Sequence, residues 1–131
     1  MSSEIQTAPV SKGMLWAGYI VSILPVLLLL LSASMKFIRP PGFAEGLEHM
    51  GWREDQMFYL GIVEITCTLL YLIPRTAYLG AILLTAYMGG AVPTHVRIGD
   101  PYFVQVLVGV FVWLGLYLRD PRIRALIPFK S

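Results

Sequence analysis

The 23 residues from Gly13 to Met35 contain no charged side chain, and six consecutive aliphatic residues, 26–31, lie within them. A helix needs about 20 apolar residues to cross the hydrocarbon core of a bilayer. This run is therefore long enough to span a membrane, and it limits the possible folds more than any other feature. Charged residues make up only 14% of the 131-residue chain, whereas a soluble domain carries about 25%. The sequence predicts an integral membrane protein rather than a water-soluble domain.

Three shorter apolar segments follow the first one, at 57–73, 76–92 and 102–118. Prolines stand at their edges, where a missing N–H group and a rigid ring end a helix. Together with a first span at 13–35, the segments predict an all-α bundle of four transmembrane helices. We expect one domain over residues 13–128, preceded by a polar and disordered leader over residues 1–12.

The linker from Lys36 to Gln56 is the only long connection between the expected spans. Within it Phe43, Leu47 and Met50 recur at helical spacing, and Trp52 follows them. The spacing predicts a short amphipathic helix that lies on or dips into the outer leaflet. An ordered but inert loop is the alternative interpretation.

The basic residues predict the orientation of the bundle. An even number of spans places both termini on one side, and that side carries six basic residues: Lys12, Arg75, Arg119, Arg122, Arg124 and Lys130. The opposite side carries four: Lys36, Arg39, Arg53 and Arg97. By the positive-inside rule, we expect a multi-pass protein of the cell inner (plasma) membrane with both termini in the cytoplasm. A net charge of +2 is far below that of a surface that follows phosphates, so the expected partner is the lipid bilayer and not a nucleic acid.

Glu64 is the one charged residue that lies deep within an expected span. A charge near the centre of a membrane helix costs about 2.5–3.5 kcal/mol on insertion scales, so such a residue normally faces the bundle interior and is paired or protonated. Gly61, Thr68 and Tyr71 share its helical face. This polar face predicts which side of the second span points inward.

Three basic residues lie at the same expected depth as Glu64: Lys36, His95 and Arg97. The stretch from Gly89 to Thr94 is rich in glycine and contains a proline, so we expect irregular backbone there, which a membrane protein tolerates around a wet cavity. A desolvated carboxylate near a histidine and two cations is typical of sites tuned for proton transfer. We therefore predict Glu64 and His95 as catalytic residues and Lys36 and Arg97 as ligand-binding residues. The alternatives are an ion pair that only fixes helix register, and basic side chains that only anchor helix ends.

Other candidate residues carry weaker signals. Tyr71 shares the face of Glu64, and Trp113 lies with Gln105 and Gly109 on about one face of the fourth span, so both aromatic residues are candidate ligand-binding residues, with core packing as the alternative. Small residues recur every four positions along the third span, at Ala77, Ala81, Thr85 and Gly89. Such a face lets helices approach closely, either within the bundle or in a homo-oligomer. Two histidines without ligand spacing and a single cysteine predict no metal site.

The chain resembles the DoxX-like family of small four-helix membrane proteins. The resemblance extends over residues 14–128 and is carried by these segments: 34–37 (SMKF), 61–64 (GIVE), 70–76 (LYLIPRT), 80–87 (GAILLTAY), 89–92 (GGAV), 94–97 (THVR) and 113–120 (WLGLYLRD). The relatives that give the family its name resemble subunits of a thiosulfate:quinone oxidoreductase, and others are linked to membrane redox complexes. The resemblance implies redox-complex subunits as partners, and for a redox-linked protein it implies a quinone-sized pocket or a membrane anchor rather than a chain that carries electrons itself. The cofactor is left unidentified, with a quinone as the candidate.

Three functions are compatible with these observations. The first is an inner-membrane protein that binds a small lipophilic or quinone-like molecule and is associated with membrane redox metabolism. The second is a membrane-embedded acid–base enzyme, an isomerase or hydrolase, that acts on an apolar substrate. The third is a non-catalytic subunit or scaffold in which Glu64 only holds helices together.

Overall fold

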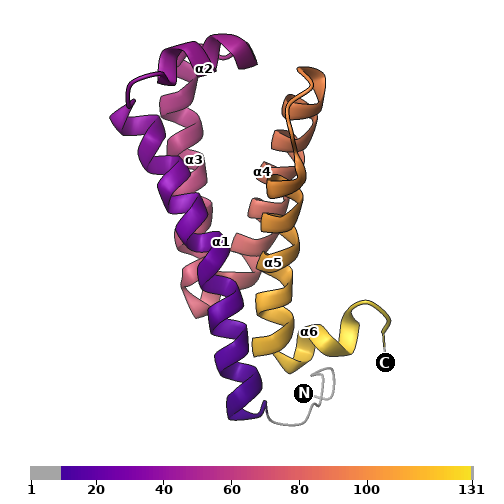
Figure 1. Ribbon diagram of the computed structural model, residues 1–131. Helices are drawn as coiled ribbons and strands as arrows, with labels where there is room; N and C mark the ends of the chain where they lie inside the picture. The colour runs from indigo at the N-terminus through magenta and orange to yellow at the C-terminus, as the bar shows by residue number, and fades with distance from the viewer. Residues whose placement is uncertain (1–9, 131) are drawn as a thin grey trace.

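A computed structural model describes residues 10–130, and the regular structure among them is entirely helical, which confirms the all-α prediction. In chain order the elements are α1 (Lys12–Ile38), α2 (Phe43–Met50), α3 (Glu54–Leu72), the 3-10 turn η1 (Pro74–Thr76), α4 (Ala77–Arg97), α5 (Phe103–Arg119) and α6 (Pro121–Leu126). Four of the helices are long rods, while α2 and α6 are short and lie at opposite ends (Figure 1).

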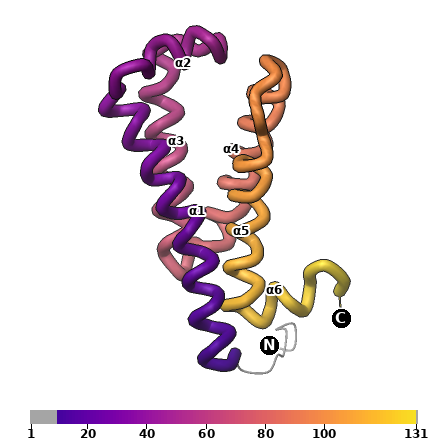
Figure 2. Tube along the Cα trace, in the orientation of Figure 1, coloured from indigo at the N-terminus to yellow at the C-terminus, as the bar shows by residue number. Residues whose placement is uncertain are grey.

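The four long helices form a ring in which α1 contacts α3 and α5, and α4 contacts the same two helices from the other side. The connection between α4 and α5 lies at the end that carries α2, which we call the α2 end (Figure 1). The opposite end, with η1 and α6, is the α6 end. Toward the α2 end, α1 and α3 separate from α4 and α5 (Figure 2). All four long helices therefore pack closely together only in the half of the bundle at the α6 end.

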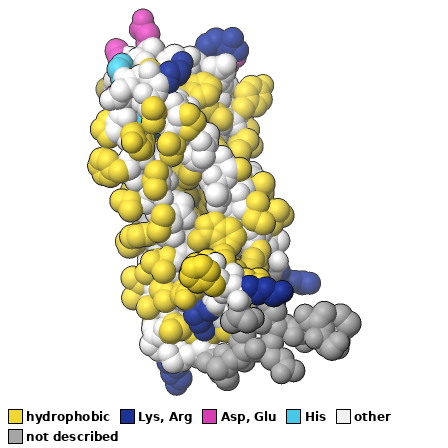
Figure 3. Space-filling model, turned by 90° about the vertical axis from the view of Figure 1, so that its right-hand side faces the viewer, with side chains coloured by type: hydrophobic (Ala, Val, Ile, Leu, Met, Phe, Trp, Pro, Cys, Tyr) yellow, Lys and Arg dark blue, Asp and Glu magenta, His cyan; other side chains and the backbone are white. Residues whose placement is uncertain are grey.

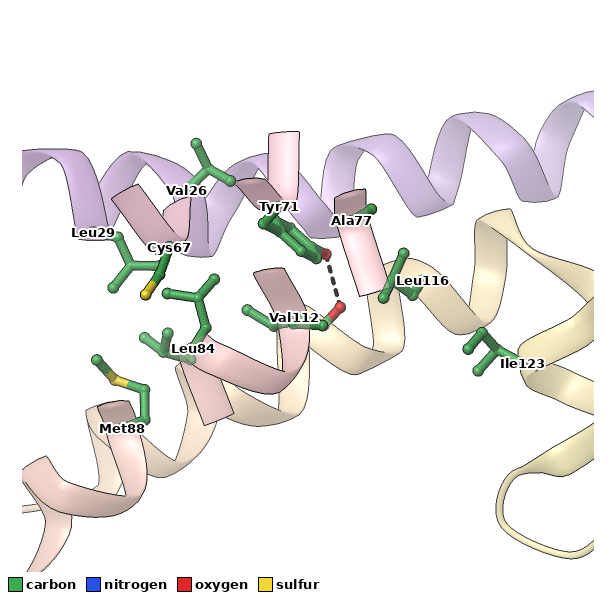
Figure 4. Close-up of a cluster of buried hydrophobic side chains, with 12 residues drawn as sticks. Val26, Leu29, Cys67, Tyr71, Ala77, Leu84, Met88, Val112, Leu116 and Ile123 are labelled. Carbon is green, nitrogen blue, oxygen red and sulfur yellow. Dashed lines mark hydrogen bonds between the residues drawn. The ribbon is translucent and has the colours of Figure 1, made fainter. Parts of the chain in front are cut away.

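The hydrophobic core lies where the ring is closed. It joins side chains of all four long helices, among them Leu29, Tyr71, Leu84 and Val112 (Figure 4). The hydroxyl of Tyr71 donates a hydrogen bond of 2.7 Å to the carbonyl oxygen of Val112 and lies 3.2 Å from Ser22 Oγ. Because a buried hydroxyl without a partner is costly, this bond lets the largest core side chain sit at 1% exposure.

Helix α4 differs from the prediction of irregular backbone between Gly89 and Thr94, which is wrong: the helix continues to Arg97 with Pro93 inside it. A proline removes one backbone donor but leaves the other hydrogen bonds of the turn in place. In addition, Thr94 Oγ1 donates to the Gly90 carbonyl at 2.9 Å, and His95 Nδ1 lies 2.8 Å from the Ala91 carbonyl oxygen. These side-chain contacts lie on the turn that contains Pro93 and add to its backbone hydrogen bonds.

The structure also bears on two other predicted segments, the leader and the helix in the long linker. The predicted leader, 1–12, falls largely on residues 1–9, which lie outside the described residues. Ser11 is the N-cap of α1 and accepts a hydrogen bond from the Met14 N–H group, so Lys12 already belongs to the helix. The predicted amphipathic helix in the long linker is confirmed as α2, in which Leu47 is buried; its place in the outer leaflet stays a prediction.

The corner between α5 and α6 is built around Asp120. Its carboxylate accepts hydrogen bonds from the backbone and guanidinium of Arg122 and from the hydroxyl of Tyr78. Burial raises the pKa of the Asp120 carboxyl group, but these hydrogen bonds outweigh burial and hold the pKa below its usual value. Asp120 therefore caps α6 as a charged group and fixes its direction.

The outer surface of the bundle is strongly apolar. Ile20, Leu27 and Ile82 are 59%, 58% and 56% exposed, and hydrophobic side chains cover the middle of one face, with charged ones near its two ends (Figure 3). Soluble monomers rarely expose apolar patches of such extent. Two helical segments, 12–38 and 74–97, are long and apolar enough to cross a membrane, whereas α5 is apolar but has only 17 residues. The surface is that of a membrane protein, and the crossing of all four long helices stays a prediction.

Candidate ligand-binding cavity

A cavity of about 600 Å³ lies in the open half of the bundle. Its walls come from α1, α3, α4 and α5, with α2 and the residues after it beside them; most of the lining side chains are apolar, including Leu28, Leu31, Met35, Phe43, Leu47, Met50, Trp52, Met57, Leu60 and Met88. Its volume falls within the range of about 300–1,000 Å³ that is usual for ligand sites. The few polar side chains in the lining are therefore the candidates for ligand recognition.

Glu64 is the central polar residue of the cavity wall and is 1% exposed. Three donors meet at its Oε1 atom: Lys36 Nζ at 2.8 Å, Ser32 Oγ at 3.3 Å and the Tyr87 hydroxyl at 3.3 Å. Lys36 Nζ also donates to Ser32 Oγ at 2.9 Å, because the two residues lie one turn apart on α1. The carboxylate thus links α1, α3 and α4 at the side of the cavity.

A glycine allows α1 to approach α3 beside this group. A Cβ atom at Gly61 would lie 2.9 Å from Phe37 Cζ and 3.3 Å from Lys36 Cβ, which is closer than side chains normally pack. Because Gly61 is one turn before Glu64 on the same face of α3, its missing side chain leaves room for Lys36 to reach the carboxylate. The local sequence of α3 therefore supplies both the charge and the space for its partner.

His95 forms a second polar group in the lining, together with Gln105 of α5. The carbonyl oxygen of Ala91 can only accept a hydrogen bond, so the His95 Nδ1 atom beside it carries the proton. In the neutral ring Nε2 is then an acceptor, and it receives a hydrogen bond from Gln105 Nε2 at 3.3 Å. This assignment leaves Gln105 Oε1 buried and without a partner among residues 10–130. The two contacts orient the His95 ring, with Nδ1 toward the Ala91 carbonyl oxygen and Nε2 toward Gln105.

The structure brings some of the predicted site residues together and separates others. Lys36, Glu64 and His95 line the same cavity. Arg97 does not join them: its guanidinium donates to the Met50 carbonyl oxygen and lines a smaller hollow beside Trp52. It therefore connects the end of α4 to α2 instead of meeting the buried carboxylate.

The two aromatic candidates also lie outside the cavity lining. Tyr71 belongs to the core in the closed half of the bundle. Trp113 Nε1 donates to Thr85 Oγ1 at 2.7 Å, which connects α5 to α4. Both side chains have packing roles in the structure, which is the alternative that the sequence left open.

The face of small residues on α4 is divided. Ala77 and Ala81 are buried in the bundle, whereas Thr85 and Gly89 are exposed. The first two allow close packing within the chain. A homo-oligomer through the exposed pair stays a prediction.

Tyr87 is the site residue that sequence reasoning missed. It lies eight residues before His95 on α4, a spacing that brings two side chains close to one face of a helix. The signal was hidden because the segment between them was expected to be irregular. Among residues 10–130, no group of three or more histidine, cysteine or acidic side chains is placed to hold a metal ion.

Comparisons with known proteins place the chain in context. Residues 20–117 match the model of the DoxX-like family. No curated protein and no solved structure matches the chain. The matched segment includes Lys36, Glu64, Tyr87, His95 and Gln105, so the whole polar lining of the cavity lies inside the family region.

Proposed function

Because the chain belongs to the DoxX-like family and is a membrane protein, we propose that it crosses the membrane four times and binds a small lipophilic molecule in the cavity between its helices. The four crossing helices are α1, α3, α4 and α5. The observation that carries the proposal is an apolar cavity of about 600 Å³ with a buried carboxylate in its wall.

The distribution of charges supports the orientation of this bundle. Arg75, Arg119 and Arg122 lie in or beside η1 and α6, at the α6 end, together with the start of α1. The positive-inside rule assigns this end to the cytoplasm and the α2 end to the outer side of the plasma membrane. The cavity then lies in the outer half of the bilayer, next to α2.

Cysteine labelling tests this topology. Cys67 is buried, so the unmodified protein provides a silent background. A cysteine that replaces Glu45 on α2 is expected to react in intact cells with a thiol reagent that cannot enter the cytoplasm. A cysteine that replaces Lys130 is the matched exposed position at the other end and is expected to react only after lysis. Labelling of the two positions in the reverse order would contradict the orientation.

The chemistry of the lining favours a ligand with a polar oxygen head and an apolar body, as in quinone-like molecules. The apolar lining suits the body, and Lys36, Glu64 and His95 supply hydrogen bonds and proton acceptors for the head. In this proposal Glu64 and His95 donate or accept the protons that the ligand exchanges, while a redox enzyme of the membrane supplies or withdraws its electrons. Such a role is consistent with an association with membrane redox metabolism.

Filling the cavity tests the binding function. Replacing Ala91 by phenylalanine introduces a large side chain into the lining, whereas the same change at Val92, the next residue, is outside it. We expect the Ala91→Phe variant to lose a small lipophilic molecule that is otherwise detected by native mass spectrometry of the purified protein, with the loss exceeding about tenfold. The Val92→Phe variant is expected to retain it.

Recovery of bulk phospholipid alone from the unmodified protein would contradict ligand binding. Two explanations would then remain: an acid–base enzyme that does not retain its apolar substrate on purification, and a scaffold in which the bonds between Glu64, Lys36 and Tyr87 only hold α1, α3 and α4 together.

A further inference from the structure

Only one of the two carboxylate oxygens of Glu64 accepts hydrogen bonds from the described residues. Its three hydrogen bonds, from Ser32, Lys36 and Tyr87, all end on Oε1. Within residues 10–130 the other oxygen, Oε2, accepts none, although the residue is 1% exposed and lines the cavity. The fully buried side-chain atoms without a partner in this range are Gln105 Oε1 and one guanidinium nitrogen of Arg119, so Oε2 of Glu64 is not sealed off and is open to the cavity. The cavity therefore contains a strong acceptor that has no partner in this part of the chain.

Lys36, which lies beside Glu64, has an N–H group that is free to donate a further hydrogen bond. The ammonium group of Lys36 has three N–H bonds, of which one is directed to Glu64 Oε1 and one to Ser32 Oγ. The third has no acceptor among the described residues, and Lys36 is also part of the lining. The same place in the wall thus offers one free acceptor and one free donor.

We propose that the ligand of this cavity presents a hydroxyl group to Lys36 and Glu64, so that the site binds phenols, hydroquinones or alcohols in preference to the corresponding carbonyls and ethers. A hydroxyl group donates one hydrogen bond and accepts another, which matches the two free positions. A carbonyl or ether oxygen accepts from Lys36 but leaves Oε2 of Glu64 unpaired. This inference rests on the proposed function, because it specifies the head group of the ligand that the cavity binds.

The charges of the site favour a neutral head group. Lys36 and Glu64 form an ion pair at 2.8 Å, so their charges cancel within the wall. A carboxylate or an amine on the ligand would bring an unbalanced charge into an apolar cavity, which is strongly unfavourable. The preferred ligand is therefore uncharged as well as hydroxylated.

A matched pair of probes tests the inference without any redox chemistry: 4-octylphenol and its methyl ether, 4-octylanisole. The two share their ring and tail, but only the phenol donates a hydrogen bond. Binding to the purified full-length protein in lipid nanodiscs can be followed by fluorescence, because Trp52 lines the cavity, and a Trp52→Phe variant assigns the signal. We expect the phenol to bind about ten- to hundred-fold more tightly, since the ether leaves a buried acceptor unpaired.

The outcomes separate the inference from the proposed function. Equal affinity for the two probes would overturn the hydroxyl preference and leave the lipophilic-ligand function intact. Binding of neither probe would overturn both. Tighter binding of octylamine than of 4-octylphenol would overturn the inference in favour of a site for cations.

A variant pair identifies the group responsible. In Glu64→Gln the amide NH2 group can take the position of Oε2, and it donates a hydrogen bond instead of accepting one. We therefore expect the affinities for the phenol and the ether to differ by less than about threefold. Glu54→Gln removes an exposed carboxylate that pairs with Arg39 and is expected to keep the full preference. Retention of the full preference by Glu64→Gln would overturn the assignment. If this variant does not fold, the comparison of the two probes on the unmodified protein still tests the preference for a hydroxyl group.

Discussion

Replacing Lys36 by methionine is expected to reduce the free energy of unfolding by about 3–5 kcal/mol. Methionine has a similar length and keeps the apolar part of the side chain in place, so the change removes mainly the charge. Glu64 is then a buried carboxylate, at 1% exposure, that has lost the one cation paired with it among residues 10–130. Its remaining donors are the hydroxyl groups of Ser32 and Tyr87 at 3.3 Å, which do not balance a charge. Unfolding by heat in detergent, followed by far-UV circular dichroism, measures the loss.

The control for this variant is Arg39→Met. Arg39 pairs with Glu54 at 3.2 Å, but the two side chains are 42% and 53% exposed, and such surface pairs contribute about 0–1 kcal/mol. A loss in Lys36→Met that is no larger than in Arg39→Met would contradict a charged, buried Glu64. The double variant Lys36→Met/Glu64→Leu removes both charges and is expected to recover most of the stability. It is also expected to lose the preference for phenols, which separates a binding role of the pair from a structural one.

The positions of the long helices could be predicted from the sequence because each one contains a long, mainly apolar segment with charges or prolines near its ends. The inward face of α3 could also be predicted, since Gly61, Glu64, Thr68 and Tyr71 recur at helical spacing and all are buried. The presence of Pro93 led to the wrong prediction of irregular backbone between Gly89 and Thr94. A proline commonly ends a helix, but in α4 the turn is kept by the remaining backbone bonds and by the side chains of Thr94 and His95.

That error explains why the structure brings together only some of the residues that were predicted to converge. Residues two positions apart are rotated by about 200° around the helix axis and so point to nearly opposite sides. His95 and Arg97 therefore cannot face the same carboxylate once α4 continues through both of them. The structure directs His95 to the cavity and Arg97 to the Met50 carbonyl oxygen of α2. Irregular backbone would have allowed both to converge.

The rotation of each helix about its own axis limits what a single sequence can predict. Lys36 and Glu64 lie at the same depth and have opposite charges, so their pairing could be expected. The contribution of Tyr87 depends on how α4 packs on α3, which no pattern in the sequence specifies. Gln105 and Trp113 share about one face of α5, but they are about 12 Å apart along the helix. Only Gln105 therefore reaches the level of the cavity.

The packing of α4 on α3 depends on Gly80, and replacing it by alanine is expected to reduce the free energy of unfolding by about 3 kcal/mol, the upper part of the range for overpacked cores. A Cβ atom at this position would overlap the backbone N and Cα atoms of Tyr71 and lie 2.8 Å from the carbonyl carbon of Leu70. Backbone atoms cannot move aside as the end of a flexible side chain can. The two helices must therefore separate, which moves Tyr71 away from the Val112 carbonyl oxygen, its partner at 2.7 Å.

Gly89 provides the matched control, because it lies on the same helix and the same substitution meets no atom within 4 Å. Alanine is a better helix former than glycine by about 0.5–1 kcal/mol, so Gly89→Ala is expected to raise the midpoint of thermal unfolding while Gly80→Ala lowers it. Opposite signs for one chemical change on one helix would locate the effect in the contact with α3. If both variants lose stability equally, the close approach at Gly80 does not hold α4 in place, and the geometry that brings Tyr87 to Glu64 must depend on other contacts.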